Sequence, residues 1–407
     1  MTMRQVVEEA GYARYIYRLR VSSTTSGLLG AEWGRCRWVW NECVHMSRKV
    51  HLHNRTDPEA QRSCGPADLD KLLTQARGAM AWLSEGASVP QQQTVRDFAK
   101  SRAKALKDIK AGLPVSRRAG MPKSKRKREA RASLNYTRRG FRIKDGRLHL
   151  AGGIVVTVVW SRDLPGDPSS VRVYQDAIGH WYASFVVPAA VEPLPATGRA
   201  IGIDWGVKEI ATTTSGDHDL PHSQHGKSVA RKLAHYQRQM ARRLQPKGKA
   251  QTKGYRKARR QAAKLQRKVA NQRRDTARKW AKSVVRDHDA LAVEDFRPTF
   301  LGRTTMARKA ADAAIGATKT ALIEQARKHG RTVHLVNPAH TTMDCAHCGA
   351  RAKHRLPLSE RIYTCTACGV SSSRDKNSAR VMLVRAGLNP AGADRGRPQR
   401  PSDVAAA

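Results

Sequence analysis

The pattern of apolar and polar residues divides the first hundred residues into one strand and several helices. Residues 13–22 alternate in the manner of a strand. Apolar residues near helical spacing then predict helices over 27–52, 67–85 and 91–111. We therefore expect a small helical lobe over 25–111, inserted after a single strand.

Residues 140–188 change to strand periodicity. The run 140–150 is typical of strand–turn–strand, because Asp145-Gly146 is a hairpin signal. Further strands are predicted over 153–160, 170–175 and 180–187. With the strand over 13–22, these segments indicate a β-barrel-like module, which a basic linker over 112–132 joins to the lobe.

The second half of the chain has a mixed pattern, in which apolar strands alternate with helices. This alternation is typical of an α/β domain. The strands are predicted at 199–206, 208–214, 290–296 and 331–337, and the helices at 228–288 (a basic hairpin broken near 246–248), 305–329 and 376–386. The tail from 388 onward is expected to be disordered.

Charge narrows the class of protein. The chain has 407 residues, with 76 Lys and Arg against 33 Asp and Glu, a net charge of +43. Repulsion on that scale favours a polyanionic partner, and nucleic acid is the usual one. A generic basic surface, as in an architectural protein, is the alternative. No run reaches the ~18 apolar residues of a membrane span, so we expect a cytosolic protein without a membrane partner.

Three carboxylates stand where strands and a helix could bring them together. Asp204 ends an apolar strand, with Gly202 and Gly206 leaving room around it; Glu294 ends another, and Asp375 lies at a helix start. Clustered carboxylates raise one another's pKa values unless cations neutralise them. Two divalent ions ~3.5–4 Å apart would do so and would promote in-line phosphodiester hydrolysis. Mg²⁺ (or Mn²⁺) suits such oxygen ligands. The alternative is three ordinary surface acids.

Other acids are not expected to join this site. Strand alternation points Asp295 away from Glu294. Four more acids lie in polar turns and are expected to be solvated: Asp217, Asp219, Asp287 and Asp289.

Cysteine spacing predicts a metal site of a different kind. Cys345 and Cys348 form one CxxC knuckle, and Cys365 and Cys368 form a second. Two such knuckles, each followed by glycine, indicate a closed site for structural Zn²⁺. Cys36, Cys43 and Cys64 lack this spacing and are expected to be buried or free thiols.

Basic side chains form two candidate surfaces for nucleic acid. Acids are nearly absent from both, which favours phosphate binding over internal pairing. The linker could equally be a flexible arm. The candidates are Lys123, Lys125, Arg126 and Lys127 of the linker, and Arg238, Arg242, Arg243, Arg260, Arg267, Lys268, Arg273 and Arg274 of the hairpin.

The order of these motifs and the residues in them resemble those of the transposon-encoded TnpB nucleases and the compact type V CRISPR effectors related to them. GIDWGVKEIATT is similar to the first RuvC motif, and KLQRKVANQRRDTARKWAKSVVRDHDALAVEDF to the helix and strand of the second. HTTMDCAHCGA followed by LPLSERIYTCTACGVSSSRDKNSARVML resembles a zinc ribbon that runs into the third. The likeness is close over about 200–385 and looser over 1–199. SSSRD departs from the family, which often has an extra Asp before the Arg.

This resemblance implies a multidomain α/β architecture. Asp204, Glu294 and Asp375 would be the catalytic acids of a RuvC, or ribonuclease-H-like, domain. The implied divisions are a wedge β-barrel over 1–24 and 112–198, a helical recognition lobe over 25–111, the RuvC domain over 199–344 and 370–387, and a target-nucleic-acid-binding zinc ribbon over 345–369.

The same resemblance implies an RNA-guided DNA endonuclease that cuts double-stranded DNA beside a short motif read by the protein. Its cofactors would be Mg²⁺ (or Mn²⁺), Zn²⁺ and a guide RNA; its partners would be the guide RNA and target duplex, bound as a monomer or as a homodimer on one RNA. It would act in the bacterial cytoplasm, associated with the nucleoid when DNA-bound. A CRISPR effector is favoured over a transposon-encoded TnpB. A non-catalytic guide-RNA- or DNA-binding protein and a guide-independent transposase remain alternatives.

Overall fold

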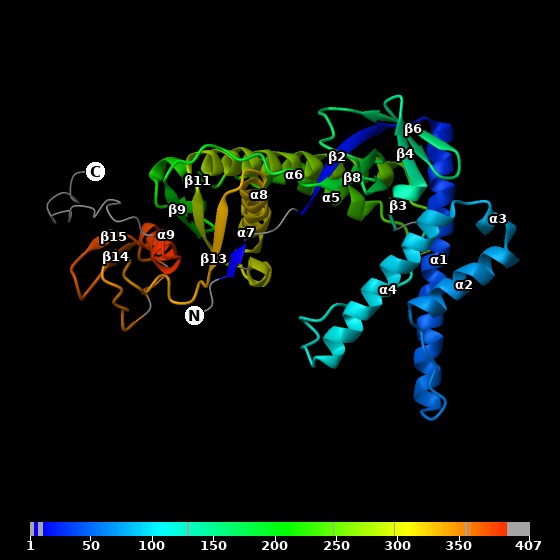
Figure 1. Ribbon diagram of the computed structural model, residues 1–407, viewed down its shortest axis with the longest axis horizontal. Coiled ribbons are helices and arrows are strands. Elements are labelled where there is room, and N and C mark those ends of the chain that lie inside the picture. Colours follow the sequence, from blue (N-terminus) through cyan, green and yellow to red (C-terminus); the bar gives the residue numbers. More distant parts are fainter. Residues whose placement is uncertain are drawn as a thin grey trace. The chain divides into compact units, whose positions relative to one another are not determined.

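The computed structural model describes residues 4–6, 11–127, 130–246, 248–296, 298–354, 356–357 and 359–388, without the side chains of 4–6, 298 and 300. The chain divides into two compact units, one of residues 11–189 and one of residues 1–10 with 190–407 (Figure 1). Apart from Leu388, the predicted disordered tail lies outside the described residues. None of the described helices combines the length and apolar composition that a membrane crossing requires.

The unit of residues 11–189 is built on an antiparallel sheet of seven strands. Alternation sets its inner face, since Leu134 and Tyr136 of β3 and Tyr17 and Leu19 of β2 are buried in one core. Strand β3 lies beside the polar linker and was not predicted. In order across the sheet the strands are β3 (Ser133–Thr137), β7 (Ser170–Gln175), β8 (Trp181–Pro188), β2 (Tyr12–Arg20), β6 (Ile154–Val159), β5 (Arg147–Leu150) and β4 (Phe141–Lys144).

The predicted hairpin turn and helices of this unit are present. Asp145 and Gly146 join β4 to β5 with φ of 51° and 68°, the left-handed conformation such a turn requires. Helix α1 contributes to two cores, because Leu29 and Cys36 pack under the sheet while Val39 packs among the other helices. The helices are α1 (Ser23–Thr56), α2 (Pro66–Ala79), α3 (Ala81–Ser84) and α4 (Ser88–Lys110), with a short 3₁₀ helix η1 (Arg138–Gly140) after β3.

The second unit contains a mixed sheet of six strands. Strands β9, β12 and β13 are parallel, and the remaining pairings are antiparallel. Residues 1–24 therefore do not belong wholly to the barrel-like module: β1 pairs with the free edge of β13, whereas β2 joins the other sheet. The order is β1 (Arg4–Val6), β13 (Thr332–Val336), β12 (Ala290–Glu294), β9 (Ala200–Trp205), β10 (Glu209–Thr213) and β11 (Leu220–Pro221).

Helices cover both faces of this sheet. Apolar residues of α6 and α8 pack on one face, with Ile201, Ile203 and Leu291. Met382 and Leu383 of α9 pack on the other face against Ala292 and Val336. The elements are η2 (Gly216–His218), α5 (His225–Arg242), α6 (Lys253–Asp287), η3 (Pro298–Arg303), α7 (Ala307–Ala313), α8 (Ile315–Lys328), and α9 (Arg374–Arg385), which follows the short ribbon strands β14 (Ile362–Thr364) and β15 (Ser371–Ser373).

The helix expected over 305–329 differs in detail. It is interrupted at Ala314, whose φ of 53° cannot continue a right-handed helix. The basic hairpin has its predicted break, because α5 ends at Arg242 and the 35-residue α6 begins at Lys253. Only the C-terminal half of α6 packs in the main core, through residues such as Trp280 and Val284, while its N-terminal half reaches away from the sheet beside α5 (Figure 1).

Candidate functional site

Strand alternation places Asp204 and Glu294 on the same face of the sheet. In β9, Ile201 and Ile203 face the core beneath α6 and α8, so Asp204 faces the α9 side. In β12, Leu291 and Val293 face that same core, so Glu294 also faces α9. The two strands are parallel neighbours in register, with Val293 opposite Ile203. The next residues, Glu294 and Asp204, are therefore adjacent at the strand ends.

A glycine contact brings the third acid to this face. A Cβ at Gly202 would meet the carbonyl oxygen of Ala379 at 2.0 Å, so only glycine permits α9 to lie this close to β9. Asp204 is two residues beyond Gly202 on the same strand face, and Asp375 is one helical turn before Ala379. The close approach therefore directs Asp375 toward Asp204.

The electrostatics of the acids reflect this convergence. Burial raises the pKa of Asp204 well above its usual range, and the charges of Glu294 and Asp375 raise it further, whereas Arg374 opposes the shift. Burial also raises the pKa of Glu294 to about 7, although the Trp205 backbone N–H donates to its Oε2 at 3.2 Å. Three full negative charges are thus unfavourable without cations. Three carboxylates on one face are a donor set that fits Mg²⁺ or Mn²⁺.

The residues around Asp375 fix the start of α9. Arg374 donates through its Nη1 to the Pro357 carbonyl at 3.0 Å, and Asn377 donates to the Asp344 carbonyl at 2.8 Å. On the other side of the helix start, Lys376 donates through its Nζ to the Thr213 carbonyl at 2.8 Å. Arg374, Lys376 and Asn377 thus fix the start of α9. The Asp375 carboxylate itself lies 3.5 Å from Arg374 Nε and 3.7 Å from Arg361 Nη1.

Asp219 also helps to hold the start of α9, through Lys376, and the prediction that Asp219 is solvated is wrong. Its Oδ2 accepts from Lys376 Nζ at 2.7 Å, and its Oδ1 accepts from the Thr213 backbone N–H at 2.7 Å. The predictions for Asp287 and Asp289 are wrong for the same reason, because Arg286 and Arg331 bind them. Polar composition marks a turn but does not reveal which tertiary partners reach it. Asp217 is exposed as expected.

Asp295 faces the opposite side of the sheet, as alternation predicts. Its Oδ1 accepts from Lys319 Nζ of α8 at 2.6 Å. Neither Lys376 nor Asp219 was a candidate from the sequence. The signal that could have identified Lys376 is its place in the polar run directly beside Asp375.

Lys376→Met should reduce phosphodiester cleavage by about 10- to 100-fold, because residues that orient a metal-binding carboxylate typically contribute that much to activity or metal affinity. The measurement is the cleavage rate against Mg²⁺ concentration. We expect the half-maximal Mg²⁺ concentration to rise while nucleic-acid affinity stays nearly constant. Arg380→Met, which removes an exposed cation from the same helix, is the matched control. Equal behaviour of the two variants would contradict the positioning role of Lys376.

The four predicted zinc cysteines are brought together. Their Sγ atoms lie within 4.8 Å of one another, with Cys345–Cys368 at 3.8 Å and Cys348–Cys365 at 3.6 Å. A tetrahedral site with Zn–S of ~2.3 Å requires S–S distances of roughly 3.8 Å. The arrangement therefore fits one Zn²⁺.

The two knuckles share one backbone geometry. The N–H of Gly349 donates to the Cys345 carbonyl at 3.0 Å, and that of Gly369 donates to the Cys365 carbonyl at 2.9 Å. Both glycines have positive φ, 74° and 73°, which the tight turn requires. Burial opposes ionisation at Cys365, but N–H groups of the turn and neighbouring thiols lower its pKa to about 6.

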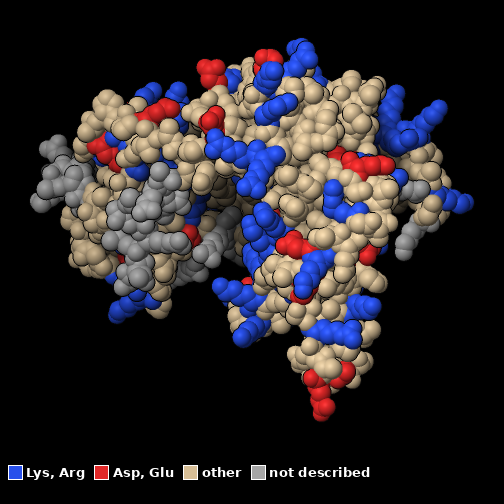
Figure 2. Space-filling model, turned by 45° about the vertical axis from the view of Figure 1, so that its right-hand side comes forward, with Lys and Arg blue, Asp and Glu red and all other residues tan. Residues whose placement is uncertain are grey.

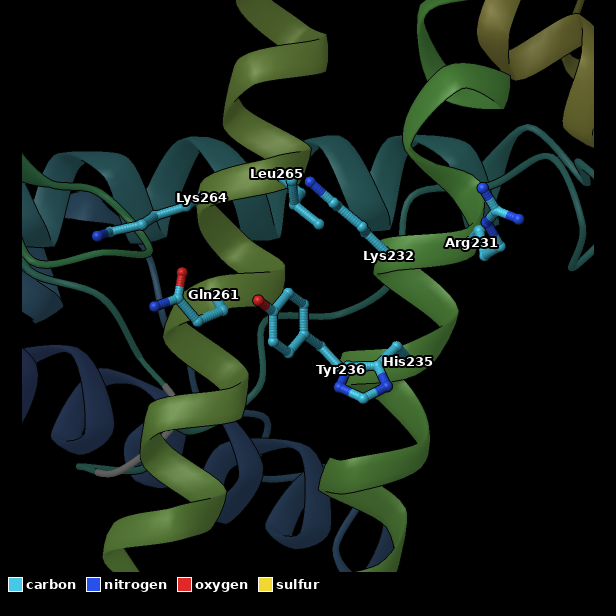
Figure 3. Close-up of a pocket in the computed structure, with 7 residues that line it drawn as sticks. All are labelled: Arg231, Lys232, His235, Tyr236, Gln261, Lys264 and Leu265. Carbon is cyan, nitrogen blue, oxygen red and sulfur yellow. The ribbon is translucent and has the colours of Figure 1, made fainter.

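Most of the predicted phosphate-binding cations are exposed. In the hairpin these are Arg238, Arg242, Arg243, Arg260, Lys268 and Arg274, and in the linker Lys123, Arg126 and Lys127. Figure 2 shows Lys and Arg side chains widely spread over the face it displays. A groove of about 400 Å³ opens between α5 and α6, where Tyr236 of α5 points toward Gln261 of α6, and Arg231, Lys232 and Lys264 add cations to its lining (Figure 3).

Two candidates have internal roles, and Arg267 is half-buried. Lys125 Nζ lies 3.6 Å from the centroid of the Trp40 ring, and its backbone N–H donates to Asn41 Oδ1 at 2.7 Å. The described part of the linker is therefore anchored to α1 and is not a free arm. Arg273 binds the buried Asp312 at 2.7 Å, and Asp312 also accepts from the Gly226 backbone N–H. The structure thus places Lys125 and Arg273 in packing contacts, unlike the exposed candidates.

Strand order, parallel central strands and the face that carries the acids define a RuvC-type, ribonuclease-H-like α/β domain, with a ribbon that holds four cysteines. Residues 171–297 match the family OrfB_IS605, described as "Probable transposase", and residues 316–382 match the Cas12f1-like TNB domain. A Streptomyces pristinaespiralis protein named as an RNA-guided DNA endonuclease is 29% identical over 406 residues, 98% of this chain and 94% of that protein.

Two further comparisons agree. InsQ of Escherichia coli K12, also named as an RNA-guided DNA endonuclease, is 26% identical over 371 residues, 86% of each chain. Cas12f1, solved by cryo-EM in a complex with sgRNA and target DNA, shares the fold with a TM-score of 0.51 and 13% identity, over 89% of this chain and 83% of that one. The resemblance is confirmed: this chain is a relative of the TnpB-like nucleases and compact type V effectors.

Proposed function

We propose that this chain is an RNA-guided endonuclease that cleaves double-stranded DNA. The observation that carries the proposal is the convergence of Asp204, Glu294 and Asp375 on one sheet face, with the raised pKa values of Asp204 and Glu294. Carboxyl groups with raised pKa values are unlike ordinary surface acids. They bind divalent cations well, because the cation compensates the unfavourable negative charge. Two bound Mg²⁺ ions would supply a nucleophile at neutral pH and stabilise the charge on the reacting phosphate.

The protein's own residues would hold and orient this site. Asp204, Glu294 and Asp375 would bind the cations through their oxygens. The Trp205 backbone N–H, which donates to Glu294 Oε2, fixes one carboxylate, and Lys376 with Asp219 fixes the helix that carries another. The ribbon restrains the same helix through Asn377, so the four cysteines would act structurally while bound Zn²⁺ cross-links them.

RNA guidance is supported by the charge of +43 and by the names of the two relatives. A guide RNA with an opened duplex presents many phosphates, and a protein that binds their shape leaves sequence selection to base pairing. The exposed cations of α5 and α6 and the groove between these helices would bind phosphates (Figure 3). A non-catalytic binding protein would have no need of the three clustered acids.

Finer assignments belong to the same proposal. The sheet of residues 11–189 would be a wedge-type barrel and α1–α4 an inserted recognition lobe, and this unit would read a short DNA motif beside the target. The particle would be a monomer, or a homodimer on one RNA. A compact CRISPR effector and a transposon-encoded TnpB fit the site equally.

The test is a guide exchange. The chain is purified with RNA from its native locus, and that RNA is replaced by one with a different guide segment. We expect the cut site to move to the duplex that matches the new guide, with mismatches next to the protein-read motif reducing cleavage most, because pairing begins there. RNase treatment should abolish cutting. Sequence-specific cleavage that ignores the exchanged guide would instead support a guide-independent transposase or nuclease.

A further inference from the structure

The unit of residues 11–189 contains a groove of about 620 Å³ that the proposed active site does not use. Four of the eight tryptophans in the chain line it: Trp33 and Trp38 of α1, Trp82 of α3, and Trp181 of β8. Trp82 is 41% exposed, and its ring centroid lies 6.3 Å from that of Trp38 in a T-shaped arrangement. The volume lies within the ~300–1,000 Å³ of sites that enclose small ligands.

Part of one side of the groove is left free of side chains because α1 has glycines there. Ser26, Gly30 and Gly34 line the groove from successive turns of α1. A Cβ added at Gly30 or Gly34 would meet no atom within 4 Å, so neither glycine is required by packing. Glycine is unfavourable inside a helix. These two positions therefore keep space that a side chain would fill.

The charge of the lining selects the kind of ligand. Among the described lining residues there are three cations and no acid. Glu32 neutralises Arg35 at 2.9 Å, which leaves Arg37 and Lys127 as the net positive charge. A cationic ligand would be repelled, although indole faces often bind one. A planar aromatic group that carries a negative charge fits both the rings and the cations.

We propose that this groove holds an unpaired nucleotide, with its base stacked on the exposed indole ring of Trp82 and its phosphate at Arg37 and Lys127. Base faces inside a duplex are covered by their neighbours, so indole stacking requires an unpaired or terminal base. The inference rests on the proposed function only in taking nucleic acid as the ligand. RNA and DNA strands share this chemistry.

The experiment measures binding of the full-length chain to short single-stranded RNA, single-stranded DNA and blunt duplex by fluorescence anisotropy. No divalent cation is added, so cleavage does not contribute. Gly30→Met fills the groove without removing a contact and also favours the helix. Gly27→Met is the matched control, since a Cβ at Gly27 also meets nothing within 4 Å and Gly27 does not line the groove. Trp82→Ala removes an exposed ring, and Leu52→Ala removes an exposed apolar side chain from α1 outside the groove.

We expect Gly30→Met and Trp82→Ala to weaken single-strand binding about 5- to 100-fold, the loss of one stacked base. Trp82→Phe should recover most of it, and Gly27→Met and Leu52→Ala should bind normally. Lys127→Gln should lower the salt dependence by about one phosphate contact. The arm with the larger loss, RNA or DNA, identifies the strand.

Photocrosslinking supplies an independent readout. A 5-bromouracil base in the preferred strand should crosslink to peptides that contain Trp33, Trp38 or Trp82. Gly30→Met that binds like Gly27→Met, or crosslinks that map only outside the groove, would overturn the inference. An occupant other than nucleic acid, such as a peptide, would give that same result. If the protein cleaves under guide control but the groove variants bind single strands normally, only this inference is contradicted. If the groove variants weaken binding but no guided cleavage occurs, only the proposed function is contradicted.

Discussion

Asp204→Asn, Glu294→Gln or Asp375→Asn should each reduce DNA cleavage by about 10³-fold or more, because each removes one cation ligand, worth about 4 kcal/mol or more of barrier. Binding of guide RNA and target DNA should persist, because affinity comes from the basic surfaces. The measurement is single-turnover cleavage in Mg²⁺, with anisotropy for binding. Mn²⁺ should also support activity, and chelation should stop it.

Two observations make this prediction specific. Burial and neighbouring charge raise the pKa of Asp204, so its charge is unfavourable in the metal-free protein. Asp204→Asn should therefore keep or raise the thermal stability of the metal-free chain, and loss of cleavage could not be ascribed to unfolding. Asp217→Asn, an exposed acid of η2, is the control and should cut normally. Near-normal cleavage by any of the three variants would contradict the assignment of that residue.

Loss of zinc from the ribbon should reduce DNA cleavage nearly as much as loss of a catalytic acid. Cys345→Ser or Cys368→Ser should reduce bound zinc from one ion per chain to almost none by elemental analysis, since a structural site depends on four ligands. Cleavage should fall about 100-fold or more. The physical reason is the contact between ribbon and helix α9: Asn377 bridges the Asp344 carbonyl and the Ala346 N–H, at 2.8 and 3.1 Å. A ribbon that unfolds releases the helix that carries Asp375, and metal binding supplies the folding energy of such modules.

Thr366→Ala provides the control for the zinc prediction. Thr366 is exposed and lies inside the second knuckle, between Cys365 and Cys368, so its removal leaves all four thiolates. This variant should retain zinc and cleavage. Hydrogen exchange should show faster exchange at the start of α9 in the cysteine variants than in Thr366→Ala. A zinc-free protein that cuts at the normal rate would exclude the structural role.

The local sequence was sufficient to predict those features that depend on residue periodicity or on motif spacing. Alternation in β9 and β12 placed Asp204 and Glu294 at the ends of buried strands and separated Asp295 from them, because side chains in a strand alternate between faces. The two CxxC knuckles predicted the cysteine cluster, because two ligands per tight turn leave few other geometries. Net charge indicated the polyanionic partner, since it depends on composition alone.

Only the tertiary structure decided which residues meet over long separations. The ion pair between Lys376 and Asp219 joins residues 157 positions apart, and the cation–π contact of Lys125 with Trp40 is also between residues far apart in the sequence. The same is true of Arg273, which a count of charges assigns to the surface and which binds buried Asp312. The groove of four tryptophans requires α1, α3 and β8 to pack together. Periodicity specifies which face of an element is apolar, whereas the partner of that face depends on how all the elements pack.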